Sequence, residues 1–323
     1  MGWYEAVGRR AFFALDPETS HRVAQRLLGL PLPWRRIGGA SEDPALGTTL
    51  TGIPLRNPVG LAAGFDKDCR HLDALGLLGF GFVVGGTVTL RARPGNRRPR
   101  IARDPARRAL VNAMGLPNAG AHAAARALAR SRRTCPRVVS IADEELPDVV
   151  AAVEVLAPYV DAIEINASSP NAGWTHRADH LGAICRAVRE GSGLPVWAKL
   201  PPFAGDGDRD GILAMASAAE AGGASALTCG NTVPVADPRM PTGRGGLSGG
   251  PLTERTPRIV AEVRAASGLP VLACGGVFSA EDAAACLEAG AAAVQVYSGL
   301  IYGGPGVVGR LTAGLAARVP AAD

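Results

Sequence analysis

The sequence predicts an α/β fold in which eight parallel strands, each followed by a helix, close into a (β/α)8 barrel behind a short N-terminal helical extension. The first observation is a regular alternation of short apolar runs with amphipathic segments along most of the chain. The second is a length of 323 residues, which suits a barrel of roughly 250 residues with insertions. The third is a composition of 47% hydrophobic and 20% charged residues, which can fill one large core.

The predicted strands are short apolar runs bounded by turn residues: Pro58–Ala63, Gly81–Gly86, Arg137–Ala142, Val160–Asn166, Pro195–Leu200, Ala224–Cys229, Pro270–Gly275 and Ala292–Tyr297. Helical patterns lie between them at Ala119–Arg130, Leu146–Ala157, Asp179–Glu190, Ile212–Ala221, Thr256–Ala266 and Ala280–Ala289. An open dinucleotide-binding sheet is the rival fold. It has fewer strands than these eight, and no GxGxxG motif follows the first strand here.

The first 45 residues lie outside the barrel pattern, so we expect an N-terminal helical segment over 1–45 and the barrel over 46–323. Trp3–Leu15 and Pro17–Leu28 have the pattern of amphipathic helices, with Asp16 as the N-cap of the second. Neither approaches the roughly 20 apolar residues of a transmembrane helix. Two alternatives stay open for this pair: it lies on a membrane surface, or it docks on the barrel as a helical hairpin.

Charge and cysteine content argue against several classes of protein. The net charge of +5 is spread along the chain without a basic stripe interleaved with aromatic residues, so nucleic-acid binding is not expected. The six cysteines are scattered without CxxC or zinc spacing, and nothing resembles a secretory signal. We therefore expect reduced thiols in a cytosolic protein, and no metal site.

The two lysines are conspicuous, because the other 32 of the 34 basic residues are arginines. An ammonium group is a compact charge with three donors and an adjustable pKa, which a planar guanidinium does not imitate. Lys67 and Lys199 both lie at or just past the ends of predicted strands. Active sites of barrels lie at that end, so both lysines are candidate site residues.

Amides, hydroxyls and glycines gather at the same strand ends. Asn166–Asn171, with the sequence NASSPN, follows the fourth strand. Glycines 275 and 276 follow the seventh strand, and Tyr297-Ser298 follows the eighth, positions at which barrels commonly bind a phosphate through backbone N–H groups. A phosphorylated cofactor held there would place its ring over a mouth lined by Ala63, Gly64, Thr87, Asn166 and Lys199.

Taken in order, these motifs resemble the class 2 dihydroorotate dehydrogenases, flavin mononucleotide (FMN) enzymes that oxidise dihydroorotate to orotate and pass the electrons to a quinone. The resemblance runs from about Phe13 to Arg310. Its motifs are LAAGFDKD at 61–68, GTVT at 86–89, PGNxxPRxxR at 94–103, NxSSPN at 166–171, Asn-Thr at 231–232, GGLSG at 245–249 and YSG at 297–299.

The resemblance implies a role for each matching residue. Ser169 would take the proton from substrate C5 while the hydride at C6 passes to flavin N5, and Lys67 and Lys199 would complete the catalytic set. The substrate would be bound by Lys67, Asn112, Asn166, Asn171, Asn231 and Thr232. The FMN would be bound by Ala63, Gly64, Thr87, Ser140, Asn166, Lys199, Gly249, Gly275, Gly276, Tyr297 and Ser298. His21 and Arg103 match quinone-side residues, and the N-terminal helices would attach the protein to the inner face of the cell membrane.

Several positions depart from the family pattern, mostly around the substrate. The usual NRMGFNN is NAMGLPN at 112–118, and GxNIGK is VVSIAD at 138–143, which puts Ser140 where an FMN-contacting asparagine is usual. The usual arginine after GLSG is replaced by Gly250. Two alternatives therefore stay open: an FMN-dependent relative acting on another dihydropyrimidine or cyclic amide, and a flavin-free phosphate-binding barrel.

Overall fold

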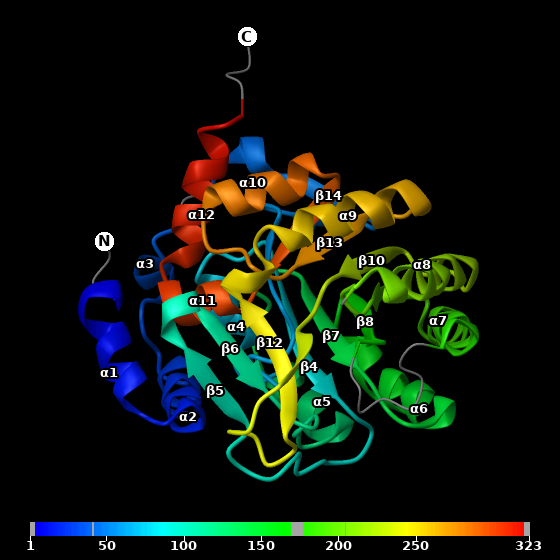
Figure 1. Ribbon diagram of the computed structural model, residues 1–323, viewed down its shortest axis with the longest axis horizontal. Coiled ribbons are helices and arrows are strands. Elements are labelled where there is room, and N and C mark those ends of the chain that lie inside the picture. Colours follow the sequence, from blue (N-terminus) through cyan, green and yellow to red (C-terminus); the bar gives the residue numbers. More distant parts are fainter. Residues whose placement is uncertain (1–3, 41, 169–176, 204, 320–323) are drawn as a thin grey trace.

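The eight predicted strands form a closed parallel barrel in the computed structural model, which describes residues 4–40, 42–168, 177–203 and 205–319 (Figure 1). Around the barrel they are β3 (Val59–Leu61), β4 (Phe82–Val88), β7 (Arg137–Ile141), β8 (Ala162–Asn166), β9 (Val196–Lys199), β10 (Ala226–Cys229), β13 (Val271–Cys274) and β14 (Ala291–Val296). β14 pairs back with β3, which closes the barrel. The predicted fold is confirmed, and each strand end lies within two residues of its predicted position.

The predicted barrel helices are also confirmed. They are α5 (Ala121–Arg130), α6 (Leu146–Leu156), α7 (Ala178–Ser192), α8 (Asp206–Ala221), α9 (Arg255–Ala266) and α10 (Ala280–Glu288). Three further helices, α4 (Leu72–Leu77), α11 (Ser298–Gly303) and α12 (Val307–Ala316), were not predicted from the sequence. Short turns of 3-10 helix occur at Pro44–Leu46, Pro105–Arg107, Ala157–Tyr159 and Gly250–Leu252.

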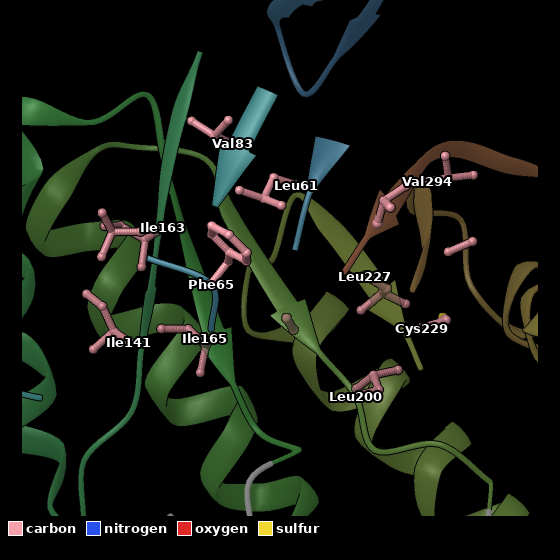
Figure 2. Packing of buried hydrophobic residues seen from close by; sticks show 14 of the residues in the cluster. Leu61, Phe65, Val83, Ile141, Ile163, Ile165, Leu200, Leu227, Cys229 and Val294 are labelled. Carbon is pink, nitrogen blue, oxygen red and sulfur yellow. The ribbon is translucent and has the colours of Figure 1, made fainter. Parts of the chain in front are cut away.

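Alternate residues of each barrel strand point outward to the helices and inward to the barrel axis, as the two-residue period of a strand requires. Val83, Ile163, Leu227 and Val294 belong to the large outer core beneath the helices, and Figure 2 shows how they pack. Their strand neighbours point inward and form a second cluster in the barrel interior: Phe82, Val84, Ala162, Ala226 and Ala293, together with Trp197.

The N-terminal end of the barrel is closed by an antiparallel hairpin, β1 (Thr48–Leu50) and β2 (Ile53–Leu55). Leu50 and Leu55 belong to the inner cluster. The Trp197 indole packs edge-on against the Phe82 ring at 5.4 Å and donates from Nε1 to Thr51 Oγ1 at 3.1 Å. With this end filled, the opening lies at the carboxyl ends of the strands.

A four-stranded antiparallel sheet, which the sequence analysis missed, stands beside that opening. Its order is β11 (Val233–Ala236), β12 (Arg244–Gly249), β6 (Ala109–Asn112) and β5 (Ile101–Asp104). The glycine-rich segment 245–250 therefore forms most of a strand. A Cβ on Gly246 would lie 2.0 Å from Thr232 Oγ1, so close packing of the β11–β12 pair requires glycine there.

The N-terminal extension lies against this sheet, beside β5 in Figure 1. It contains a π-helical turn (Tyr4–Gly8), α1 (Arg9–Ala14), α2 (Pro17–Leu28) and α3 (Trp34–Gly38). Asp16 is the predicted N-cap, since its Oδ1 accepts from Thr19 N at 3.0 Å. Glu18 is buried and accepts from Arg100 Nη2 at 2.7 Å, which ties α2 to the segment directly before β5. No helix of the described chain combines the length and hydropathy needed to cross a membrane.

Truncating Leu50 should destabilise the barrel, because its side chain is 1% exposed and helps to fill the barrel floor. We expect Leu50→Ala to lower the free energy of unfolding by about 2–5 kcal/mol in chemical denaturation, the usual range for a buried leucine. The neighbouring exposed Thr49 provides a matched control, and Thr49→Ala should change stability little. Equal effects of the two substitutions would contradict the role of the hairpin as a plug.

Candidate active site

A cavity of about 930 Å³ opens from the barrel mouth and continues beneath the N-terminal helices. Its walls come from the carboxyl ends of the barrel strands, the inner face of the four-stranded sheet, and α2. The barrel end is lined by polar groups, including Lys67, Asn166, Lys199 and Asn231. The other end is lined mostly by apolar side chains: Phe12, Phe13, Ala24, Leu27, Leu28, Leu32, Trp34, Ile37, Leu75 and Leu78.

Lys199 lies at the floor of the barrel end, where it is 4% exposed. Its Nζ donates to Gln295 Oε1 at 3.2 Å and lies 3.8 Å from Glu164 Oε1. Burial alone would lower the pKa of Lys199, but the neighbouring Cys274 and the Glu164 carboxylate outweigh it, and the pKa is raised. Lys199 therefore carries a fixed positive charge at neutral pH.

A chain of hydrogen bonds crosses the mouth from β4 to the loop after β10. Asn166 Nδ2 donates to Thr87 Oγ1 at 2.9 Å, and Asn166 Oδ1 accepts from Ser168 Oγ at 2.7 Å. Ser168 Oγ in turn accepts from Asn231 Nδ2 at 2.6 Å. Ser140 lies behind this chain, where its hydroxyl is 3.1 Å from that of Thr87, and it does not line the cavity. These bonds fix the amide edges that face the cavity.

Lys67 approaches the cavity from the loop after β3, and its Nζ donates to Gly64 O at 2.5 Å. Burial, with a smaller contribution from the Arg100 guanidinium, lowers the pKa of Lys67 to about 8. A side chain with this pKa is mostly charged at neutral pH and loses its charge in mildly alkaline solution. The two lysines thus differ: Lys199 is fixed and compensated, whereas Lys67 titrates within an accessible pH range.

Glycines bring bare backbone to the third side of the barrel mouth. Gly275 and Gly276, after β13, line the cavity together with Ser298 and Gly249. A Cβ on Gly276 would lie 2.4 Å from Thr253 N, and its φ of 70° also favours glycine. Ser298 Oγ donates to Ser248 Oγ at 3.2 Å, which joins this side to the four-stranded sheet. The arrangement is suited to a phosphate or another small anion.

The apolar end contains His21 and Arg103, the two residues that the family resemblance places on the quinone side. The Arg103 guanidinium lies 4.5 Å from the centre of the Phe13 ring and donates to Ser20 Oγ at 2.8 Å, so it ties β5 to the extension. The His21 ring packs edge-on against Phe65 at 5.3 Å. Burial, reinforced by the charge of Lys67, lowers the pKa of His21 to about 3, so this histidine is neutral at physiological pH.

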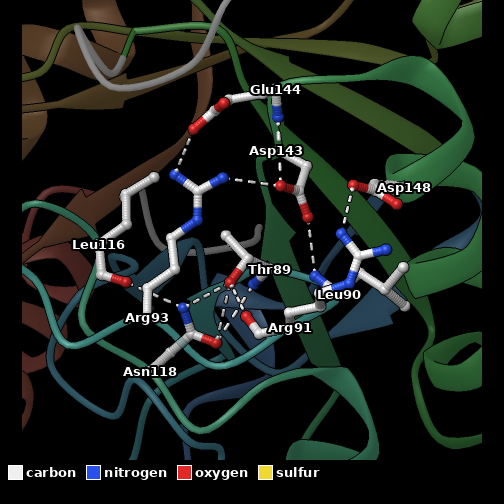
Figure 3. A network of polar contacts seen from close by, with 9 residues as sticks. All are labelled: Thr89, Leu90, Arg91, Arg93, Leu116, Asn118, Asp143, Glu144 and Asp148. Carbon is white, nitrogen blue, oxygen red and sulfur yellow. Dashed lines mark hydrogen bonds and ion pairs between the residues drawn. The ribbon is translucent and has the colours of Figure 1, made fainter.

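A polar network anchors the long segment between β4 and α5, part of which lines the cavity (Figure 3). Asp143 accepts from Leu90 N and from Arg93 Nη2, both at 2.8 Å. Asn118 Nδ2 donates to Thr89 Oγ1 and to Leu116 O, both at 2.9 Å. Asp143 stands at a position where this chain departs from the family pattern. The network gives it a structural role, because it holds the segment that carries Leu116.

Most of the predicted site residues converge on this one cavity. Its lining includes Lys67, Asn112, Asn231, Thr232, Ala63, Gly64, Thr87, Asn166, Lys199, Gly249, Gly275, Gly276, Tyr297, Ser298, His21 and Arg103. Ser169 and Asn171 lie outside the described residues. No role was assigned from the sequence to Glu164 or to the two residues that bond to it, Gln295 and Thr228. The available signal was a polar side chain inside an apolar strand, which all three share.

Comparisons with known proteins agree with this geometry. The family described as Dihydroorotate dehydrogenase matches residues 45–319. The chain is similar to a protein named dihydroorotate dehydrogenase (quinone) from Anaeromyxobacter sp. (strain K), with 39% identity over 95% of this chain and 91% of the relative. A protein of the same name from Rhodococcus opacus (strain B4) is 37% identical over 96% of this chain and 93% of the relative.

Among solved structures, the chain is similar to a dihydroorotate dehydrogenase of Eimeria tenella in complex with ferulenol. The TM-score is 0.81 at 28% identity, and the match covers 93% of this chain and 90% of that one. The family match extends from the β1–β2 hairpin to the end of α12 and so includes every strand of the barrel. By sequence and by fold, this chain belongs to the dihydroorotate dehydrogenase family.

Proposed function

We propose that this protein oxidises dihydroorotate to orotate with FMN as its cofactor and a quinone as the final electron acceptor. The observation that carries the proposal is the single cavity, which joins a polar barrel mouth to an apolar end beneath the N-terminal helices. A polar amide heterocycle suits the first environment and a quinone suits the second. The names of the relatives, dihydroorotate dehydrogenase (quinone), agree with both.

The residues present fit FMN. The bare backbone of Gly275 and Gly276, with Ser298, would hold the phosphate, and the floor around Ala63, Gly64, Thr87, Asn166 and Lys199 would hold the ring. Gly249 and Tyr297 would close the sides of this site, and Ser140 would support it through Thr87. When bound, FMN supplies a two-electron acceptor for hydride. Lys199 places positive charge where negative charge develops, at no cost of reorganisation.

The substrate would lie above the ring, between Lys67 and the amide groups. The lysine and the carboxamides of Asn112, Asn231 and Asn171 would bind the carboxylate and the ring amides, with Thr232 beside them. Ser169 would take the proton released from substrate C5. Asn166, already bonded to Ser168 and Thr87, has the fixed position that orienting a planar ligand requires.

The N-terminal segment 1–45 would serve as the quinone entry and as the contact with the membrane surface. Of the six large hydrophobic side chains exposed in the described chain, five lie between residues 7 and 32: Val7, Leu15, Leu27, Leu30 and Leu32. The apolar end of the cavity lies directly inside them, next to His21 and Arg103. A docked helical pair with apolar side chains on its outer surface satisfies both alternatives considered for this segment.

Anaerobic addition of dihydroorotate to the purified flavoprotein tests the reaction, and Ser169→Ala tests the base. Dihydroorotate should bleach the flavin absorbance of the wild type. Removing the hydroxyl should slow that bleaching by about 10²–10⁴-fold, the usual contribution of a positioned base, with little loss of orotate affinity. Unchanged bleaching in the variant would remove Ser169 from this role. Wild-type protein that keeps its colour at saturating dihydroorotate would instead favour another cyclic amide as the substrate.

Orotate affinity should depend on pH through Lys67. The pKa of about 8 means that the ammonium is present below pH 8 and is lost above it, together with its attraction for a carboxylate. The association constant should fall above pH 8 by up to about tenfold per pH unit, the limit for one coupled proton. Lys67→Met should bind more weakly at neutral pH and should lose this slope. A slope that persists in the variant would assign the titration to another group.

Charges introduced at the exposed apolar side chains should weaken binding to membranes. We expect Val7→Glu and Leu30→Glu to reduce sedimentation with anionic phospholipid vesicles without slowing flavin reduction by dihydroorotate. Val7 is 69% and Leu30 48% exposed, and neither lines the cavity. Val319, 40% exposed near the other end of the chain, is the matched control, so Val319→Glu should leave vesicle binding unchanged. Equal losses at all three positions would contradict a specific membrane face.

A further inference from the structure

A carboxylate is buried beneath the cavity, close to Lys199. Glu164, in β8, is 0% exposed. Its Oε2 accepts from Gln295 Nε2 at 2.9 Å and from Thr228 Oγ1 at 3.1 Å. Its Oε1 has no hydrogen-bond partner among the described residues, and Lys199 Nζ lies 3.8 Å away, at ion-pair distance.

The carboxylate holds together strands on opposite sides of the barrel. β8 and β14 are four strands apart in either direction, and Gln295 spans the interior between them. Gln295 donates to Glu164 and accepts from Lys199, so one amide fixes the Glu164 carboxylate and the Lys199 ammonium relative to each other. Thr228 adds a contact from β10, and Cys274 flanks Lys199 from β13. Each group that faces the ammonium thus comes from a different strand.

This arrangement costs free energy that an apolar side chain would not. A buried carboxylate loses its hydration, and only a paired cation and good hydrogen bonds compensate for the loss. The same holds for Lys199, because an ammonium at 4% exposure without a counter-charge tends to lose its proton. A leucine in place of Glu164 would fill the space at a lower cost, but it would leave Lys199 uncompensated.

We propose that Glu164 is a positioning residue for Lys199: it keeps the ammonium charged and fixed at the cavity floor, and its own negative charge limits how much of the lysine's positive charge the cavity receives. The cavity then faces an oriented ion pair. The consequence for the cofactor rests on the proposed function, because it requires a flavin ring over Lys199. The effect on Lys199 itself does not depend on any cofactor.

The lysine content of the chain allows a direct test on the ligand-free protein. Because Lys67 and Lys199 are the only lysines in 323 residues, protein labelled with 13C at the lysine Cε should give two side-chain signals, which Lys67→Arg assigns. In the wild type, the raised pKa of Lys199 should keep its ammonium protonated above the range of an ordinary lysine. Glu164→Gln should lower its titration midpoint by about one pH unit or more, since burial then acts without a counter-charge. The Lys67 signal is the internal control and should keep its midpoint.

An unchanged Lys199 midpoint in Glu164→Gln would overturn the proposal. Glu164→Asp retains the charge one methylene further away and should give a smaller shift in the same direction. It also serves as the second variant if the glutamine variant does not fold. A residue with a merely structural role would change thermal stability in both variants but would leave the Lys199 titration where it was.

The reduction potential of bound FMN tests the consequence for the cavity. Measured at a pH where Lys199 is protonated in both proteins, the midpoint potential should rise in Glu164→Gln, because more positive charge faces the reduced ring. An unchanged midpoint potential in Glu164→Gln would overturn the claim that Glu164 limits the positive charge that reaches the cavity. Failure of dihydroorotate to bleach the flavin would count only against the proposed function, because neither readout uses the substrate.

Discussion

A closed parallel sheet directs the carboxyl end of every strand to one opening, and the remaining features of the molecule depend on this constraint. β14 returns to β3, so residues from both ends of the barrel sequence meet at that mouth. The opposite end, where the loops that follow the helices enter the strands, is filled by Trp197, Phe82 and the β1–β2 hairpin. The closure thus gives the barrel one end packed with apolar side chains and one end lined by polar groups.

The two ends of the cavity differ in their charged groups. At the barrel end, Lys199 is compensated by Glu164 and Gln295, and the amide groups are bonded to one another. At the other end, His21 is held neutral, and the charge of Arg103 is directed toward backbone carbonyls and the Phe13 ring. The docked extension provides the wall of the apolar part, so a segment outside the barrel completes the cavity.

Local signals account for what could be predicted from the sequence. A barrel strand is a short apolar run, and its carboxyl end is marked by the next turn, so Lys67, Asn166 and Lys199 could be assigned to one rim before any coordinates. The strand β12 could not, because its glycines oppose strand propensity and are required by contacts with Thr232 and Asn112. The partners of Glu164 were equally hidden. Gln295 is 131 residues away and meets it only when the barrel closes.

The scarcity of lysine has a consequence for the molecular exterior. Apart from Lys67 and Lys199, every basic side chain other than histidine is an arginine, and guanidinium groups keep their protons far into the alkaline range. Side-chain amines therefore titrate only inside the cavity, while the cationic exterior keeps the same charge. In mildly alkaline solution, the protein can therefore change the charge of an amine in its interior without changing the charge of its arginines.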